Sequence, residues 1–160
     1  MLVLFAFSCI GCQPTPVETP PPAAALPLQD FYLSYAASKA RIVPWTGFRP
    51  LGDEGAVKLL VYVSLLDSFD SRIKSPAVFR FELYEYVAYS ADHKGKRLKV
   101  WPDIDLVPAA VNNEHWREFL RAYEFSLDYE AGVGRSFVLQ ATCIRPDGRR
   151  LTDQFVLAAE

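Results

Sequence analysis

A regular alternation of side chains is the feature that most constrains this fold. Between residues 57 and 66, apolar side chains recur at every second position: Val57, Leu59, Val61, Val63 and Leu65. The positions between them are Lys58, Leu60, Tyr62, Ser64 and Leu66, so the second face is half apolar. Because successive side chains of a strand point to opposite faces of its sheet, this pattern predicts a strand with at least one buried face.

The same period recurs along the chain. It predicts strands at 79–84, 123–130, 136–145 and 149–158, with shorter ones near 38–43 and 97–101. The last two long strands flank the sequence RPDGR, where proline favours a turn and glycine accepts a positive φ. About seven strands at this spacing indicate an all-β fold, a single antiparallel β-sandwich of immunoglobulin-like or transthyretin-like type. Residues 29–37 are ambiguous between helix and strand.

One short helix is expected at residues 112–119, capped by one of the two asparagines at its start. Trp116, Phe119 and Leu120 recur at spacings of three and four, which places them on one face of that helix. We expect this face to cover one end of the sandwich.

The C-terminal part of the chain carries a resemblance. The segment from Gly132 through Phe137 and Leu139 to the PDG turn resembles the final hairpin of extracellular immunoglobulin-like modules. Such sandwiches serve adhesion, assembly and carbohydrate binding alike, so the resemblance implies a fold and does not select a function.

The N-terminal residues 1–12, MLVLFAFSCIGC, carry no charge. They are too short for a membrane span, which takes about 20 apolar residues, and they fit the apolar region of a secretory signal. Ile10, Gly11 and Cys12 resemble the lipobox of bacterial lipoproteins, in which small residues precede an acylated cysteine. The resemblance implies a signal peptide at residues 1–11 and a lipid anchor, with acyl chains such as palmitate, on Cys12.

Two alternatives stay open for this run. In the first alternative, the run is a hydrophobic strand or an extension in front of a cytoplasmic domain. In the second, Cys9 rather than Cys12 carries the lipid, and the expected location of the protein is unchanged. Residues 12–27 contain six of the chain's twelve prolines and predict an extended tether, or else a tail without a role. The remaining residues, 28–160, are enough for one folded domain.

Cysteine usage agrees with this organisation. Once Cys9 leaves with the signal and Cys12 is acylated, Cys143 has no partner for an internal disulfide. It shares a strand face with Phe137 and Ala141, so a small buried hydrophobic side chain is favoured over a nucleophile.

Several function classes find no support in the sequence. The 17 basic and 19 acidic side chains are dispersed and give a net charge of −2, which offers no surface for nucleic acid. Asp103 and Asp105 lie two apart but are too few for calcium, and neither His93 nor His115 belongs to a zinc motif. Without a GxSxG elbow or a phosphate-binding glycine loop, we expect no enzyme, no metal and no cofactor.

Two surfaces are candidates for binding. The sequence HKGKRLK places Lys94, Lys96, Arg97 and Lys99 around an expected loop. These side chains suit an anionic surface such as lipid headgroups or cell-wall polymers. The alternative is a solvated hairpin tip that discourages edge pairing.

The second candidate surface is aromatic. Tyr62, Tyr84 and Tyr86 all fall on strand faces opposite the predicted core. If adjacent strands expose that face, it is a patch suited to protein partners or stacked sugars. The alternative is that the segment around Phe31 and Tyr35, or the predicted helix, covers it.

Together these features predict a non-catalytic, lipid-anchored protein of the bacterial cell envelope that faces the periplasm or the exterior. We expect it to bind an envelope protein as an assembly or scaffold module. The alternative is a carbohydrate-binding or cell-wall-binding module that uses the aromatic sheet face. The expected partners are the membrane, through the anchor, and a protein, and nucleic acid is not expected.

Overall fold

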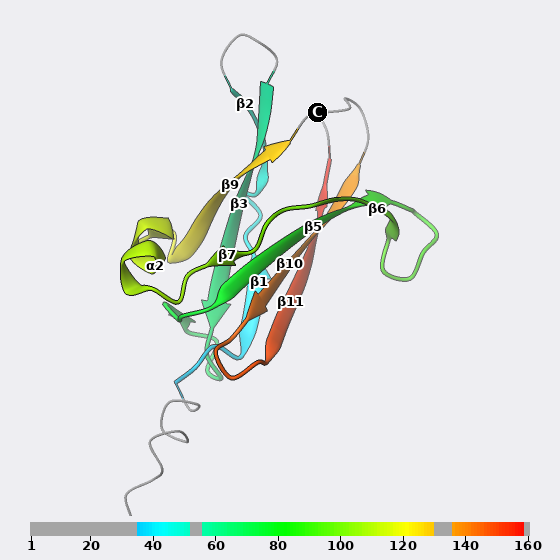
Figure 1. Cartoon of the computed structure of the whole chain (residues 1–160). Coiled ribbons are helices and arrows are strands. Elements are labelled where there is room, and N and C mark those ends of the chain that lie inside the picture. The colour runs from blue at the N-terminus through cyan, green and yellow to red at the C-terminus, as the bar shows by residue number, and fades with distance from the viewer. Residues whose placement is uncertain (1–34, 52–55, 130–135, 159–160) are drawn as a thin grey trace, which may run out of the picture.

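The computed structural model describes residues 35–51, 56–129 and 136–158. In these residues the chain forms two antiparallel sheets that pack face to face, with a short helix beside them (Figure 1). The predicted all-β sandwich is confirmed. The expected signal peptide, Cys12, the tether and Phe31 lie outside the described residues, so they stay predictions.

The larger, six-stranded sheet is built around the long strand β3 (Ala56–Leu66). Along one side, β3 pairs with β1 (Lys39–Ile42) and β2 (Gly47–Leu51). Along the other side it pairs with β9 (Ala122–Tyr129) and with the short β4 (Arg72–Ile73). The short β8 (Trp116–Arg117) extends the sheet by pairing with β9.

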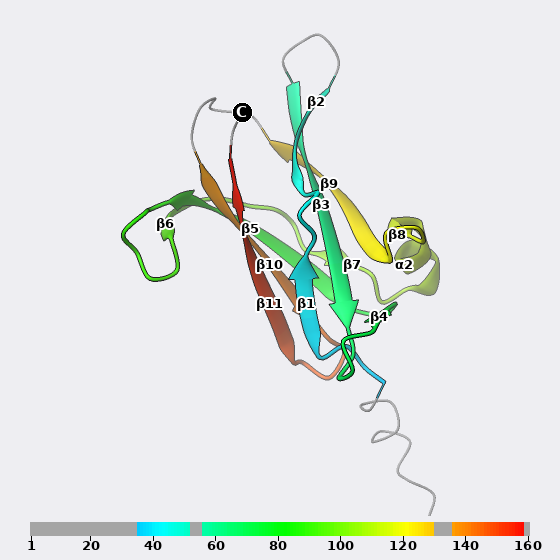
Figure 2. The same cartoon turned by 180° about the vertical axis from the view of Figure 1, so that it is seen from behind.

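The five-stranded sheet has the order β11 (Arg150–Leu157), β10 (Phe137–Ile144), β5 (Val78–Tyr86) and β6 (Lys94–Val100). The short β7 (Ile104–Asp105) also pairs with β5. The chain changes sheets after β4, after β7 and after β9, so segments distant in sequence face each other across the core (Figure 2).

The inward face of each long strand is the one that the alternation predicts. Leu59, Val61, Val63 and Leu65 of β3 are fully buried. Aromatic rings fill the space between the sheets: the ring of Phe125 lies 4.9 Å from that of Phe79 and 4.8 Å from that of Phe81, measured between centroids. Buried aromatic pairs at such distances contribute stability beyond the area they bury.

The predicted hairpin at the C-terminal end, formed by β10 and β11 around the RPDGR turn, is confirmed. Gly148 has a φ of 81°, which a residue with a side chain adopts only at a steric cost. The buried guanidinium of Arg145 reaches across from the start of this turn: its Nη1 donates to the carbonyl oxygen of Ala37 at 2.7 Å. The turn therefore fixes the place where the described chain enters the sandwich.

Helix α2 (Ala109–His115) begins earlier in the chain than predicted, and its cap is different. Pro108 stands at the N-cap with a φ of −65°, and no side chain caps the first turn. Proline suits a helix start because it lacks the N–H that would be unpaired there. The expected asparagine cap is wrong, because Asn112 lies inside the helix and is buried.

The end of the helix differs as well. Trp116 has an extended conformation and begins β8, so Phe119 and Leu120 lie in a turn rather than on a helix. Trp116 and Leu120 are buried as expected, whereas Phe119 is 81% exposed. The predicted cover over the sandwich therefore contains Trp116 and Leu120 but not Phe119.

Strand β2 was missed by the periodicity. Its sequence, GFRPL, contains Pro50, which lacks the N–H that a central strand needs. Pro50 pairs with Val57 at the edge of the sheet, where that N–H is not required. A proline inside a strand is therefore compatible with this position.

Candidate functional site

The lone described cysteine has the properties of a structural residue. Cys143 is fully buried, and burial raises the pKa of its thiol to about 12. Because the thiolate is the reactive form, a thiol with this pKa is almost entirely protonated at neutral pH. Burial and protonation both disfavour a nucleophilic role.

We therefore expect Cys143 to be inert in the native protein. In the full chain with Cys9→Ser and Cys12→Ser, a thiol reagent at pH 8 leaves the folded protein unmodified and labels the protein in urea. Adding Ser126→Cys, at an exposed position of β9, provides a control thiol that reacts in the native state. Rapid native labelling of Cys143 would contradict the burial.

The candidate acid–base and metal residues are dispersed among separate partners. Asp103 forms two hydrogen bonds with the Arg80 guanidinium, at 2.9 and 2.8 Å, and this pairing lowers the pKa of its carboxyl group. Asp105 accepts a hydrogen bond from the backbone N–H of Val107. In the described parts of the chain, no three His, Cys, Asp or Glu side chains are grouped to hold a metal ion.

The two histidines also lie in separate places. His93 is exposed, and its ring stacks on that of Tyr86 at 5.2 Å between centroids. His115 ends helix α2 and is half buried. Its Nδ1 lies 2.8 Å from the carbonyl oxygen of Glu124, so it acts as a structural contact to β9.

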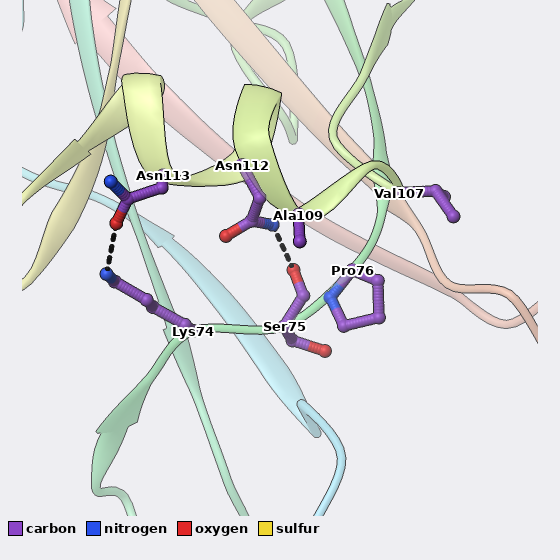
Figure 3. A pocket seen from close by; sticks show the side chains of 7 residues that line it. All are labelled: Lys74, Ser75, Pro76, Val107, Ala109, Asn112 and Asn113. Carbon is purple, nitrogen blue, oxygen red and sulfur yellow. Dashed lines mark hydrogen bonds between the residues drawn. The ribbon is translucent and has the colours of Figure 1, made fainter.

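A shallow hollow of about 360 Å³ lies between helix α2 and the segment that leads into β5 (Figure 3). Its polar groups satisfy one another. Asn112 Nδ2 donates to the carbonyl oxygens of Ser75 and Leu106, and Lys74 Nζ donates to Asn113 Oδ1 at 2.9 Å. The buried hydroxyl of Tyr123 donates to Asn112 Oδ1 at 3.0 Å. The hollow therefore joins the helix to the sandwich and contains no acid–base pair.

The three tyrosines of the predicted aromatic patch do not form one surface. Tyr62 lies on β3 in the six-stranded sheet, whereas Tyr84 and Tyr86 lie on β5 in the five-stranded sheet. The outer faces of packed sheets point away from each other, so Tyr62 is separated from the other two. Whether any of them binds a partner stays a prediction.

The surroundings of Tyr84 form the best-organised polar surface, which we call the Tyr84 face. Cross-strand pairing places its side chains in two rows across β6, β5, β10 and β11. The first row is Arg97, Tyr84, Val138 and Val156. The second row is Val100, Glu82, Gln140 and Gln154. Lys94 reaches over them from the start of β6.

A continuous set of contacts holds this face together. Lys94 Nζ lies 4.9 Å from the ring centroid of Tyr84 and donates to Gln140 Oε1 at 2.7 Å. Glu82 accepts from Arg97 at 3.0 Å and from Gln140 at 3.2 Å. Burial, and then the charge of Glu82, raise the pKa of Tyr84, so its hydroxyl stays protonated near neutral pH.

The expected basic loop is instead the edge strand β6. Its cations serve different purposes: Lys94 and Arg97 belong to the Tyr84 face, while Lys99 Nζ donates to the carbonyl oxygen of Asp128 at 2.6 Å. Lys96 is exposed, without a hydrogen bond or ion pair to another described residue. Lysines on an edge strand discourage pairing with another chain, which is the alternative role predicted for this segment.

Glu82 and Gln140 also belong to this surface, although neither was predicted as a binding residue. Glu82 has a local signal, because it lies two residues before Tyr84 and so shares its strand face. Gln140 has none, because its place beside Glu82 depends on the register between β10 and β5.

Side chains also occupy two sheet edges. The carbonyl oxygen of Asp128 on β9 accepts from both Lys99 and the indole of Trp101, the latter at 2.9 Å. At the edge of β1, the N–H of Ile42 donates to the Asp153 carboxylate at 2.7 Å. Occupied backbone groups cannot pair with an added strand, so a partner is better accommodated on a sheet face than on these edges.

Comparison with models of known protein families finds no match to this chain, and comparison with curated proteins finds none either. In the segments that the structure describes, no helix has the length and hydrophobicity needed to cross a membrane.

Proposed function

We propose that this protein is a non-catalytic, lipid-anchored protein of the bacterial cell envelope whose β-sandwich binds a protein partner. The anchor is supported by the apolar run that ends in Ile10, Gly11 and Cys12, and by the proline-rich segment after it. Acylation of Cys12 holds the sandwich near a membrane, facing the periplasm or the exterior. The tether then gives the sandwich a range of positions above that membrane.

The Tyr84 face carries the binding part of the proposal. Tyrosine and arginine are enriched among the residues that contribute most to protein interfaces, and this face contains both, Tyr84 on β5 and Arg97 on the edge strand β6. Glu82 already holds Arg97 through a hydrogen bond, and Lys94 lies against the ring of Tyr84, which reduces the entropy lost on binding. Val100 and Val156, 46% and 48% exposed, add apolar area at the two margins.

The same contacts favour a protein over a glycan. A sugar stacks on an open aromatic ring, but Lys94 lies over the ring of Tyr84, and Tyr86 is stacked on His93. The Arg97 side chain is 59% exposed and suits a carboxylate of a protein partner, although it already pairs with Glu82. We therefore place protein binding first and keep carbohydrate binding as an outcome of the test.

Site-specific photo-cross-linking in cells tests this proposal. A photoreactive residue replaces Gln154 on the Tyr84 face, or Ser126 on the outer face of the opposite sheet as a matched exposed control. We expect position 154 to give one recurring protein adduct and position 126 not to give that adduct. Adding Tyr84→Ala is expected to remove the adduct from position 154. Mass spectrometry of the same sample identifies the N-terminal peptide, which we expect to begin with acylated Cys12.

Each part of the proposal has a separate contrary result. An intact Met1 with an unmodified Cys12 would overturn the anchor. Equal adducts from both positions, or none from position 154, would overturn docking through the Tyr84 face. Retention on purified cell-wall polymer that is lost on Tyr84→Ala and Tyr86→Ala would replace the protein partner by a glycan.

A further inference from the structure

Strands β1 and β4 lie side by side with β3 at the end of the six-stranded sheet where the described chain begins (Figure 2). A second charged surface lies on the outer face of the sheet at this end. We call it the basic face. It consists of Lys39, Arg41, Arg72 and Arg121, which come from β1, β4 and the turn between β8 and β9. The sequence separates these residues widely, and sheet pairing brings them together.

Strand register fixes this arrangement. Lys39 and Arg72 both pair with Leu66, one from each side, so the three form a row across β1, β3 and β4. Arg41 pairs with Ser64, two positions along β3, and therefore shares the same face. Leu66 and Ser64 are buried even though they point away from the core, because neighbouring groups close over them.

The fourth cation is attached through the backbone. Ser64 Oγ donates to the carbonyl oxygen of Arg121 at 3.2 Å. Arg72 Nη1 donates to the carbonyl oxygen of Leu120 at 2.8 Å, and Arg121 Nη2 donates in return to the carbonyl oxygen of Arg72 at 3.3 Å. The β8–β9 turn is thus fastened to β4, and the acceptors in these bonds are carbonyl oxygens rather than carboxylates.

Exposed phenylalanines stand in the two turns that border this face. Phe69, in the turn between β3 and β4, is 84% exposed, and Phe119, in the β8–β9 turn, is 81% exposed. One exposed apolar side chain needs no explanation, but two in neighbouring turns beside four cations form an amphipathic surface. Cations and aromatic side chains together are the composition that binds the interface of an anionic bilayer.

Acidic side chains offset only part of this charge. Asp70 pairs with Lys39 at 2.7 Å. The carboxylate of Asp67 accepts from the N–H groups of Phe69 and Ser71, so it is used to shape the turn. Glu118, in the β8–β9 turn, accepts from the indole N–H of Trp116. Four cations therefore stand beside three carboxylates, so the basic face keeps a small excess of positive charge.

The point where the chain enters the sandwich indicates which anionic surface the basic face would contact. Ser38 directly precedes Lys39, and its N–H donates to the carbonyl oxygen of Leu66, at the centre of the basic row, at 2.7 Å. The segment that would carry an anchor on Cys12 therefore joins the body beside these cations. An anchored membrane is thus the anionic surface that this face would meet first.

We propose that the basic face, with Phe69 and Phe119, rests on an anionic lipid bilayer. This inference goes beyond partner binding and rests on the proposed anchor, which brings the bilayer within reach. The Tyr84 face lies on the outer side of the opposite sheet, so membrane contact leaves it directed away from the lipid.

Vesicle binding of the full chain with Cys12→Ser tests the contact without a lipid anchor. The vesicles are phosphatidylcholine alone or with 30 mol% phosphatidylglycerol, a composition chosen for the experiment. The apolar run at residues 1–12 is common to all variants, so the ratio of the two partition constants reports the electrostatic contact. We expect a ratio of about 10 or more that falls with added salt.

Matched substitutions locate the surface. Arg41→Glu is expected to lower the partition constant on anionic vesicles about 20-fold, since reversal changes the charge by two units, and Arg41→Gln about 5-fold. Lys96→Glu, the same charge change on exposed β6, is expected to alter it less than about twofold. Phe69→Ser weakens binding to anionic vesicles, whereas Tyr89→Ser, at a fully exposed aromatic residue of the β5–β6 hairpin, does not.

Two results would overturn the proposal. A ratio near one for the parent chain would mean that the face has no affinity for anionic lipid, and would leave an acidic protein as its alternative partner. Equal losses for Arg41→Glu and Lys96→Glu would mean that net charge, not this face, governs binding. Neither result bears on the acylation of Cys12, which is measured separately on the N-terminal peptide. Unchanged midpoints of urea denaturation confirm that the variants are folded.

Discussion

Replacing Phe125 by alanine lowers the free energy of unfolding by about 3–5 kcal/mol, the range for removing a buried aromatic ring. Phe125 is fully buried and contacts three rings from other elements. Its centroid lies 4.9 Å from that of Phe79, 4.8 Å from that of Phe81 and 5.1 Å from that of His115. The substitution leaves a cavity between the two sheets and beneath helix α2, and rigid strands on both sides limit collapse into it.

Urea denaturation monitored by tryptophan fluorescence measures this effect. Phe119→Ala is the matched control, because Phe119 is 81% exposed and its loss is expected to change the free energy by about 0.5 kcal/mol or less. Similar midpoints for the two variants would contradict the position of Phe125 between the sheets.

Replacing Arg145 by methionine is expected to lower the free energy of unfolding by about 2–4 kcal/mol. Arg145 is buried, and its guanidinium donates to the carbonyl oxygen of Ala37 at 2.7 Å and pairs with Asp147 at 2.8 Å. Methionine retains the apolar part of the side chain but removes every donor. Both the Ala37 carbonyl and the Asp147 carboxylate then lose their short charge-assisted contact.

Hydrogen exchange separates the local effect of this substitution from the global one. Arg145 fastens the segment that leads into β1, so the amide of Ser38 is expected to exchange faster than the loss of global stability alone accounts for. Arg149→Met is the control, because Arg149 lies 3.7 Å from the same carboxylate but its side chain is 70% exposed. Equal protection of Ser38 in both variants would show that Arg145 does not fasten this segment.

This attachment bears on the proposed arrangement at a membrane. Arg145 and the Ser38–Leu66 hydrogen bond set the point at which the N-terminal segment leaves the sandwich. If that segment carries a lipid anchor, a fixed exit beside the basic face orients the sandwich and does not merely keep it nearby. The proposed partner surface on the opposite sheet then stays accessible.

The sequence predicted the long strands well because apolar side chains alternate along them, and the alternating positions face the core. Leu59, Val61, Val63 and Leu65 of β3 and Phe79, Phe81 and Leu83 of β5 are all fully buried, as their pattern indicates. Cys143 is buried by the same rule, and Gly148 adopts the positive φ that the RPDGR turn requires. These features depend on neighbours in sequence, so a single sequence contains them.

The sequence predicted the short helix but not its start or its cap. Two asparagines resemble a cap, but Pro108 fixes the start of the helix, and Asn112 is used inside it to bond Ser75, Leu106 and Tyr123. A polar residue that is buried for its long-range hydrogen bonds has the same local sequence signature as a capping residue.

What the sequence by itself determined is which side chains of each strand face the core. What only the tertiary structure decided is which outward-facing side chains share a surface. Tyr62 and Tyr84 have the same local pattern, yet they lie on opposite sheets, while Lys39, Arg72 and Arg121 gather from three separate segments. The physical reason is that alternation is encoded between adjacent residues, whereas strand order and register depend on the packing of the whole core.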